Sequence, residues 1–170
     1  MKNSDIEQLA FGSWPVPEVY LAEIGRVGVV WRSLEAFVNI CLAKLAGLDI
    51  EDPKGLILFE HLSLPQKLDL PGALGEQLAP DYPNLENLSD AISKIKSAQK
   101  LRNEFMHKTV SYDEKEKALK MAVGSAREKL KVEVRTVALT EIKRATVEIS
   151  EAMRALYKVV LMRDVPPAWE

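Results

Sequence analysis

The stretch QKLRNEFMHKTV, residues 99–110, contains side chains that can bind a phosphate group and move protons beside it. Arg102 supplies a planar guanidinium, which can donate to two phosphate oxygens at once. Asn103 follows it with an amide that both donates and accepts hydrogen bonds. His107, one of 2 histidines in the chain, transfers protons near neutral pH. These three residues form the candidate catalytic set.

This set suits cleavage of a phosphodiester whose nucleophile already belongs to the substrate. In RNA the 2′-hydroxyl can attack the neighbouring phosphorus without a metal ion. We expect His107 to act as the acid–base residue and Arg102 to stabilise the charge that develops on the phosphate oxygens. Lys96, Lys100 and Lys108 are the candidate substrate-binding residues, because ammonium groups hold flanking phosphates.

Other catalytic chemistries lack their required residues. EFMH gives one Glu-x-x-His unit, but a di-iron bundle needs two, and Leu58 stands where His61 would need the glutamate. Cys41 lies between Ile40 and Leu42, which is typical of a small core residue. PGALG lacks the lysine and the strand-to-helix context of a phosphate loop. The sequence therefore predicts neither a metal nor a cofactor.

The helix that carries the candidate set should begin near Asn87, where Asp90 follows at capping spacing, and continue to about Lys108. At about 100° per residue, its apolar arc passes through Arg102. On an ideal helix His107 lies about 140° away, so one chain brings Arg102 and His107 together only if the Arg102 side chain reaches around the helix or the helix loosens near its C-terminal end. Two copies related by a two-fold axis could do so. Glu35, on the edge of an earlier helix, is a possible supporting residue and the nearest acidic candidate to face Arg102.

The remaining pattern is mostly helical. We expect a long helix from Val19 to about Ala46, a helix from Ser63 that Pro71 either kinks or splits, and a final helix from Thr140 to about Met162. Residues 131–136 alternate as in a half-buried strand, while the residues before them also favour helix. Within 114–138 we favour a small hairpin over a helix, with its turn at Gly124–Ser125.

These elements predict an all-α (mainly) fold, an antiparallel bundle of four to five helices with a small β-hairpin inserted before the last helix. The chain of 170 residues fits one domain, with residues 1–16 as an N-terminal arm and 164–170 as a tail. No cationic leader or bilayer-length apolar run is present, and 1 cysteine suggests a reducing compartment. We expect a cytoplasmic protein that does not contact membranes. The net charge of -2 leaves its partner open.

The spacing of Arg102, Asn103 and His107 resembles the Arg–polar–x–x–x–His signature of the HEPN superfamily, helical domains found in bacterial toxins and antiviral systems. That family places its signature near the end of the third main helix of a small bundle that has a long first helix, as expected here. The resemblance implies a homodimer with a composite active site, metal-independent endoribonuclease activity on RNA, and a toxin or antiphage role. It assigns catalysis to Arg102, Asn103 and His107, and implies an antitoxin or another regulatory protein as a further partner.

Two other readings use the same residues. A catalytically inactive helical dimer could bind RNA, a nucleotide or a protein partner through the basic face of the helix. A purely structural bundle would instead pair Arg102 with Glu35.

Overall fold

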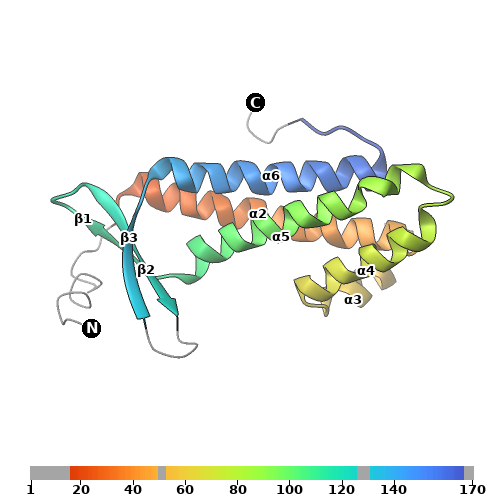
Figure 1. The fold of residues 1–170 in the computed structure, drawn as a ribbon, viewed down its shortest axis with the longest axis horizontal. Helices are drawn as coiled ribbons and strands as arrows, with labels where there is room; N and C mark the ends of the chain where they lie inside the picture. Colours follow the sequence, from red (N-terminus) through yellow and green to blue (C-terminus); the bar gives the residue numbers. More distant parts are fainter. Residues whose placement is uncertain (1–15, 50–52, 126–130, 167–170) are drawn as a thin grey trace. The chain divides into compact units, whose positions relative to one another are not determined.

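The computed structural model describes residues 16–49, 53–125 and 131–166. This part of the chain is mainly helical, with five α-helices, a short 3-10 helix and a three-stranded antiparallel sheet inserted before the final helix (Figure 1). The predicted fold class is confirmed. The elements in chain order are α2 (Glu18–Leu45), α3 (Pro53–Glu60), α4 (Leu64–Leu78), η2 (Pro83–Asn87), α5 (Leu88–His107), β1 (Val110–Asp113), β2 (Ala118–Ser125), β3 (Lys131–Val137) and α6 (Leu139–Leu161).

The described residues form two compact units. Of the described residues, the first unit takes 16–28, 101–125 and 131–146, and therefore holds the sheet, the start of α2, the end of α5 and the start of α6. The second unit takes 29–49, 53–100 and 147–166 and is helical. The helix that carries the candidate site thus contributes its first turns to the second unit and its last turn to the first.

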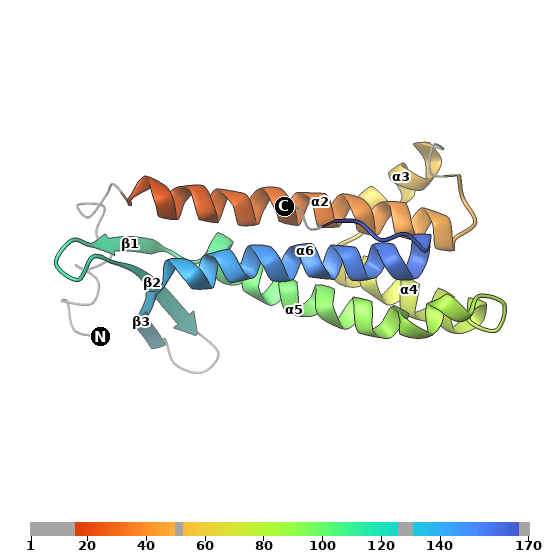
Figure 2. The ribbon, with the colours of Figure 1, turned by 90° about the horizontal axis from the view of Figure 1, so that it is seen from above.

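In the second unit, the portions of α2, α5 and α6 lie side by side, with α5 running opposite to the other two (Figures 1 and 2). The ring of Phe37 in α2 meets that of Tyr157 in α6 at 5.1 Å between centroids. Their shared core is aliphatic, because each helix presents one apolar face. Its most deeply buried members include Leu34, Val38, Leu42, Ile95, Ile149 and Leu156.

Two expectations for this unit are now decided. Helix α4 continues through Pro71 as one helix, and the Ser63 backbone N–H donates to Gln66 Oε1 at 2.9 Å, which fixes its first turn. Helix α3 begins at Pro53 and is not among the helices that the sequence analysis predicted. Proline suits this first position because the N–H that it lacks would have no partner in the helix.

In the first unit, the strands pair in the order β1-β2-β3. The predicted hairpin is present, but β1 adds a third strand to it. Asp113 Oδ1 accepts hydrogen bonds from two backbone N–H groups, Lys115 at 3.0 Å and Glu116 at 3.1 Å, which closes the turn between β1 and β2. These bonds, the backbone N–H of Glu116 first, lower the pKa of the Asp113 carboxyl.

Two details of the prediction were wrong. Gly124 and Ser125 do not form the turn, because β2 continues through them and pairs them with Val132 and Lys131. The β2–β3 connection, residues 126–130, lies outside the described residues. The final helix starts at Leu139, one residue before the predicted start at Thr140, because the side chain of Glu141 accepts the Ala138 N–H at 2.9 Å.

The ends of the chain are described only in part. Of the predicted arm, residues 1–15 lie outside the described residues. At the other end, Val165 accepts a hydrogen bond from Arg154 Nε at 2.7 Å, so the described part of the tail is bound to α6. Within the described ranges, no helix has the length and apolar character needed to cross a membrane.

Candidate active site

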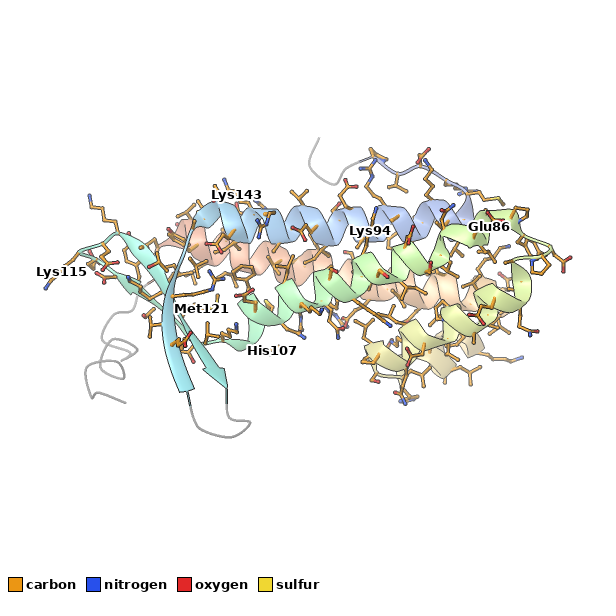
Figure 3. All side chains as sticks on the ribbon, in the orientation of Figure 1. Glu86, Lys94, His107, Lys115, Met121 and Lys143 are labelled. Atoms are coloured by element: carbon orange, nitrogen blue, oxygen red, sulfur yellow. The ribbon has the colours of Figure 1, made fainter. Side chains whose placement is uncertain are left out.

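The candidate catalytic residues lie on the last turn of α5, in the first unit. Figure 3 places His107 at the C-terminal end of this helix. Phe105, which is 4% exposed, anchors the turn in the core, while Asn103 and His107 are exposed. A histidine in the last turn also suits the negative end of the helix dipole.

Arg102, the residue that interrupts the apolar face of α5, is half-buried rather than enclosed in the core. Its Nη1 donates to Asn103 Oδ1 at 3.0 Å and lies 2.5 Å from His107 Nε2. The guanidinium therefore leaves the apolar face and reaches the polar face of the same helix. Its long side chain buries the stem together with Nε, while Nη1 reaches the exposed residues Asn103 and His107.

The structure shows the exception that the sequence analysis allowed. The long side chain of Arg102 spans the helical angle of about 140° and reaches His107 within one chain. Because α5 ends at His107, no further turn of helix stands between the guanidinium and the imidazole. All three candidate catalytic residues converge within one chain.

The contact between Arg102 and His107 constrains the protons of the imidazole. Guanidinium nitrogens are donors only, so Nε2 of His107 must present its lone pair to Nη1, and the proton of the neutral ring is then on Nδ1. A phosphate that binds Arg102 would compete for the same donor. Displacement of the guanidinium by an anion would free Nε2 to accept a proton.

The three candidate lysines differ in their surroundings. Lys108, in the first unit, lies 3.6 Å from Glu104 Oε1, so its charge is partly compensated. Lys96, in the second unit, lies 3.9 Å from Asp69 Oδ1, and both side chains are largely exposed. Lys100 is exposed and also belongs to the second unit.

The possible supporting residue Glu35 has a local partner. Its Oε2 accepts from Arg32 Nη1 at 2.9 Å, one helical turn earlier on α2. Glu35 belongs to the second unit and Arg102 to the first. The structural reading that needs Glu35 as the partner of Arg102 gains no support from this pairing.

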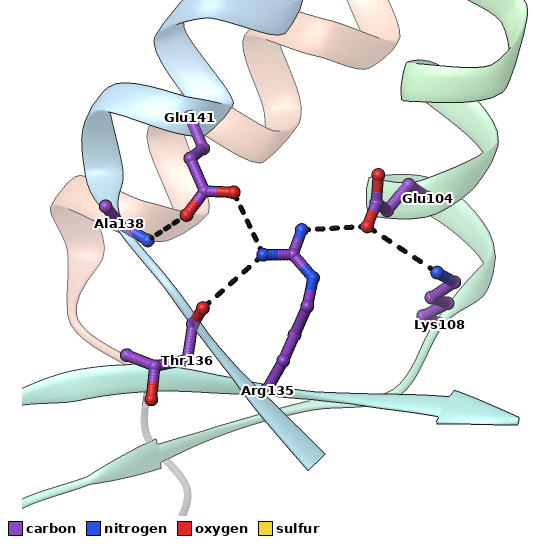
Figure 4. Close-up of polar contacts among 6 residues, drawn as sticks. All are labelled: Glu104, Lys108, Arg135, Thr136, Ala138 and Glu141. Atoms are coloured by element: carbon purple, nitrogen blue, oxygen red, sulfur yellow. Dashed lines mark hydrogen bonds and ion pairs between the residues drawn. The ribbon is translucent and has the colours of Figure 1, made fainter. Parts of the chain in front are cut away.

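Sequence reasoning missed Arg135 on β3. Its Nη2 donates to Glu104 Oε1 at 2.8 Å and its Nη1 to Glu141 Oε2 at 2.9 Å, so one guanidinium joins α5 to α6 (Figure 4). Partial burial acts to lower the pKa of Arg135, but the hydrogen bonds and charges of the two glutamates outweigh it and raise this pKa. The backbone N–H of Ala138, then Arg135, lower the pKa of Glu141 against the effect of burial.

The signal that could have revealed Arg135 was the end of the strand pattern. The charged residues at 131, 133 and 135 alternate with Val132, Val134 and Thr136, which suggests that Arg135 faces solvent. In the structure Arg135 shares its face with Val137, which is 1% exposed, and pairs across the sheet with fully buried Met121. The strand therefore turns its arginine toward the helices.

Two other chemistries find no support at these residues. Burial raises the pKa of the Cys41 thiol to about 12, so this cysteine is a neutral core residue at physiological pH. Among the residues that the structure describes, no three histidine, cysteine, aspartate or glutamate side chains gather as metal ligands would.

No protein-family model matches this chain, and no curated protein or solved structure was found to be similar to it.

Proposed function

We propose that this chain is a metal-independent endoribonuclease of the HEPN type, with Arg102, Asn103 and His107 as its catalytic residues. The observation that carries the proposal is the convergence of a guanidinium, an amide and an imidazole on the last turn of one helix, linked at 3.0 Å and 2.5 Å. A phosphate clamp next to an acid–base group is what cleavage by an internal nucleophile requires.

In the proposed reaction, Arg102 binds the non-bridging oxygens of an RNA phosphate and releases Nε2 of His107. That nitrogen takes the proton of the 2′-hydroxyl, and the 2′-oxygen attacks phosphorus. The bond from phosphorus to the 5′-oxygen breaks, and the departing oxygen receives a proton. The products are a 2′,3′-cyclic phosphate and a 5′-hydroxyl. Asn103 Oδ1 accepts a hydrogen bond from Arg102 and so orients the clamp.

A second copy of the chain would complete this chemistry. Attack and departure occur on opposite sides of phosphorus, so a base and an acid are needed at two places. The sequence has 2 histidines. His107 belongs to the first unit and His61 to the second unit, so the first unit holds a single histidine. We therefore propose a homodimer whose two copies of His107 serve as base and acid. Sedimentation at micromolar concentration tests this, and a monomer with full activity would contradict it.

The cellular role remains part of the proposal. A free endoribonuclease in the cytoplasm would damage the RNA of its own cell, so a toxin or antiphage effector held in check by an antitoxin or another regulatory protein is the role that fits. The catalytically inactive dimer that binds RNA, a nucleotide or a protein partner is less favoured, because binding alone gives no role to the contact between Arg102 and His107.

The decisive experiment is incubation of the purified protein with RNA in the presence of a chelator. We expect cleavage with 2′,3′-cyclic phosphate ends, and a loss of about a hundredfold or more in His107→Ala. His61→Ala is the matched control, because His61 is an exposed histidine outside the site. Binding of RNA without cleavage would favour the inactive dimer, and cleavage by His107→Ala at the rate of the original chain would refute the proposed role.

Arg102→Ala separates catalysis from structure. We expect cleavage to be lost while the free energy of unfolding changes by less than about 1 kcal/mol, since Arg102 is only half-buried and its Nη1 bonds the exposed residues Asn103 and His107. Arg163→Ala, at an exposed arginine beyond α6, should change neither quantity. A variant that is active but markedly less stable would show that Arg102 is structural.

A further inference from the structure

Arg135 contacts the segment that carries the proposed catalytic residues. Glu104, which accepts its hydrogen bond, stands directly after Asn103 and three residues before His107. Lys108 Nζ lies 3.6 Å from the same oxygen of Glu104, Oε1 (Figure 4). The carboxylate of Glu104 is thus bound by Arg135 on β3 and by Lys108, the residue that follows α5.

The other half of the guanidinium is fixed independently. Glu141 uses one oxygen to accept the N–H of Ala138 and the other to accept Arg135 Nη1, so it is tied to the first turn of α6. Arg135 also lies 3.4 Å from the backbone oxygen of Thr136. With its base on a paired strand and one nitrogen bound to α6, Arg135 offers Glu104 a donor with little freedom to move.

The last turn of a helix needs such support. Its carbonyl groups lack partners within the helix, and helix ends fray. On α5, the segment 102–107 includes this last turn, and the convergence of Arg102 with His107 depends on its staying helical. Phe105 fixes one side of the turn by burial, and the bond between Glu104 and Arg135 fixes another.

We propose that Arg135 is a positioning residue for the ribonuclease site, and that it holds the last turn of α5 through Glu104 so that Arg102, Asn103 and His107 converge. This inference rests on the proposed function for its effect on cleavage. Its structural part can be tested without any RNA.

The test combines nuclear magnetic resonance of the histidine rings with cleavage kinetics. The chain has 2 histidines, so His61 is an internal reference for His107. In Arg135→Gln and in Glu104→Gln, we expect the imidazole signals of His107 to shift and broaden, while those of His61 stay in place. We expect kcat to fall between about tenfold and a hundredfold with KM little changed, because a misplaced group acts mainly on the chemical step.

Two further variants define the interpretation. Lys120→Gln is the matched control, because Lys120 makes an ion pair with Glu116 and a hydrogen bond with Thr136 on the same sheet without contacting Glu104. It should leave the His107 signals unchanged. Arg135→Lys should restore the signals and kcat only in part, because one ammonium replaces a fork that binds two carboxylates.

Unchanged His107 signals in folded Arg135→Gln would overturn the inference. If that variant does not fold, Glu104→Gln decides in its place, since it leaves Arg135 bound to Glu141. Shifted His107 signals in a chain that never cleaves RNA would uphold the positioning role and refute the ribonuclease proposal, so the two failures are distinguishable.

Discussion

The two ends of α5 use the same helical face in different ways. Over the first turns the face is made of Leu88, Ala91, Ile95 and Ala98, each at most 3% exposed. At the last turn the next position is Arg102, half-buried, with its guanidinium on the polar face beside His107. The apolar pattern thus ends where the candidate catalytic residues gather.

The first turns of α5 therefore contribute mainly to the stability of the fold, and its last turn carries the candidate catalytic residues. Burial of aliphatic side chains supplies most of the free energy that holds helices together. Ion pairs whose members are about a third exposed, such as Arg135 with Glu104, contribute little to stability but fix geometry. We therefore expect substitutions at the two ends of α5 to have effects of different kind and size.

The largest effect on stability should come from the apolar end. Ile95 is 0% exposed, so Ile95→Ala removes buried methyl groups, leaves a cavity and should lower the free energy of unfolding by about 2–5 kcal/mol. Met106→Ala is the control at the other end, because Met106 is 39% exposed and should cost less than half as much. Urea denaturation measures both, and equal losses would break the contrast between the two ends.

A change in stability of intermediate size should distinguish alanine substitutions at two glycines of α4. A Cβ built on Gly75 would lie 2.7 Å from Leu88 Cδ2, whereas one built on Gly72 would meet nothing within 4 Å. Gly72→Ala should stabilise the helix by about 0.5–1 kcal/mol. Gly75→Ala should be less stable than Gly72→Ala by about 1–3 kcal/mol, because Leu88 is itself buried and must shift. Equal melting temperatures would mean that the start of α5 packs more loosely than its burial indicates.

Periodicity was sufficient to predict the helices, but not the contacts between side chains. The long helices begin and end within a few residues of the predicted positions, because their apolar faces repeat with the period of an α-helix. Helical angle alone could not decide whether the guanidinium of Arg102 stays on the apolar face or reaches the polar one, since the angle carries no information on how far a long side chain extends near a helix end.

The contacts of Arg135 could not be predicted from the sequence for a related reason. Glu104 and Glu141 lie 31 and 6 residues from Arg135 along the chain, and only the path of β3 between two helices brings both to one guanidinium. Its neighbours in the sequence favour a solvent-facing position. A long-range ion pair of this kind leaves no local pattern.

The smallest expected effect is the dependence of stability on pH at the polar end. The pKa of Glu141 is lowered in the folded chain, first by the N–H of Ala138 and then by Arg135. A lowered pKa means that the ionised form favours folding, so the contribution of Glu141 to stability is complete above its unfolded pKa and is lost as pH falls through the folded pKa.

We expect the original chain to lose more stability than Glu141→Gln between pH 7 and acidic conditions below about pH 4.5. The difference should be less than about 1 kcal/mol, because the side chain is 34% exposed. Urea denaturation of both chains at the two pH values measures it. Parallel losses would mean that the network around Arg135 contributes nothing to stability through the carboxylate of Glu141.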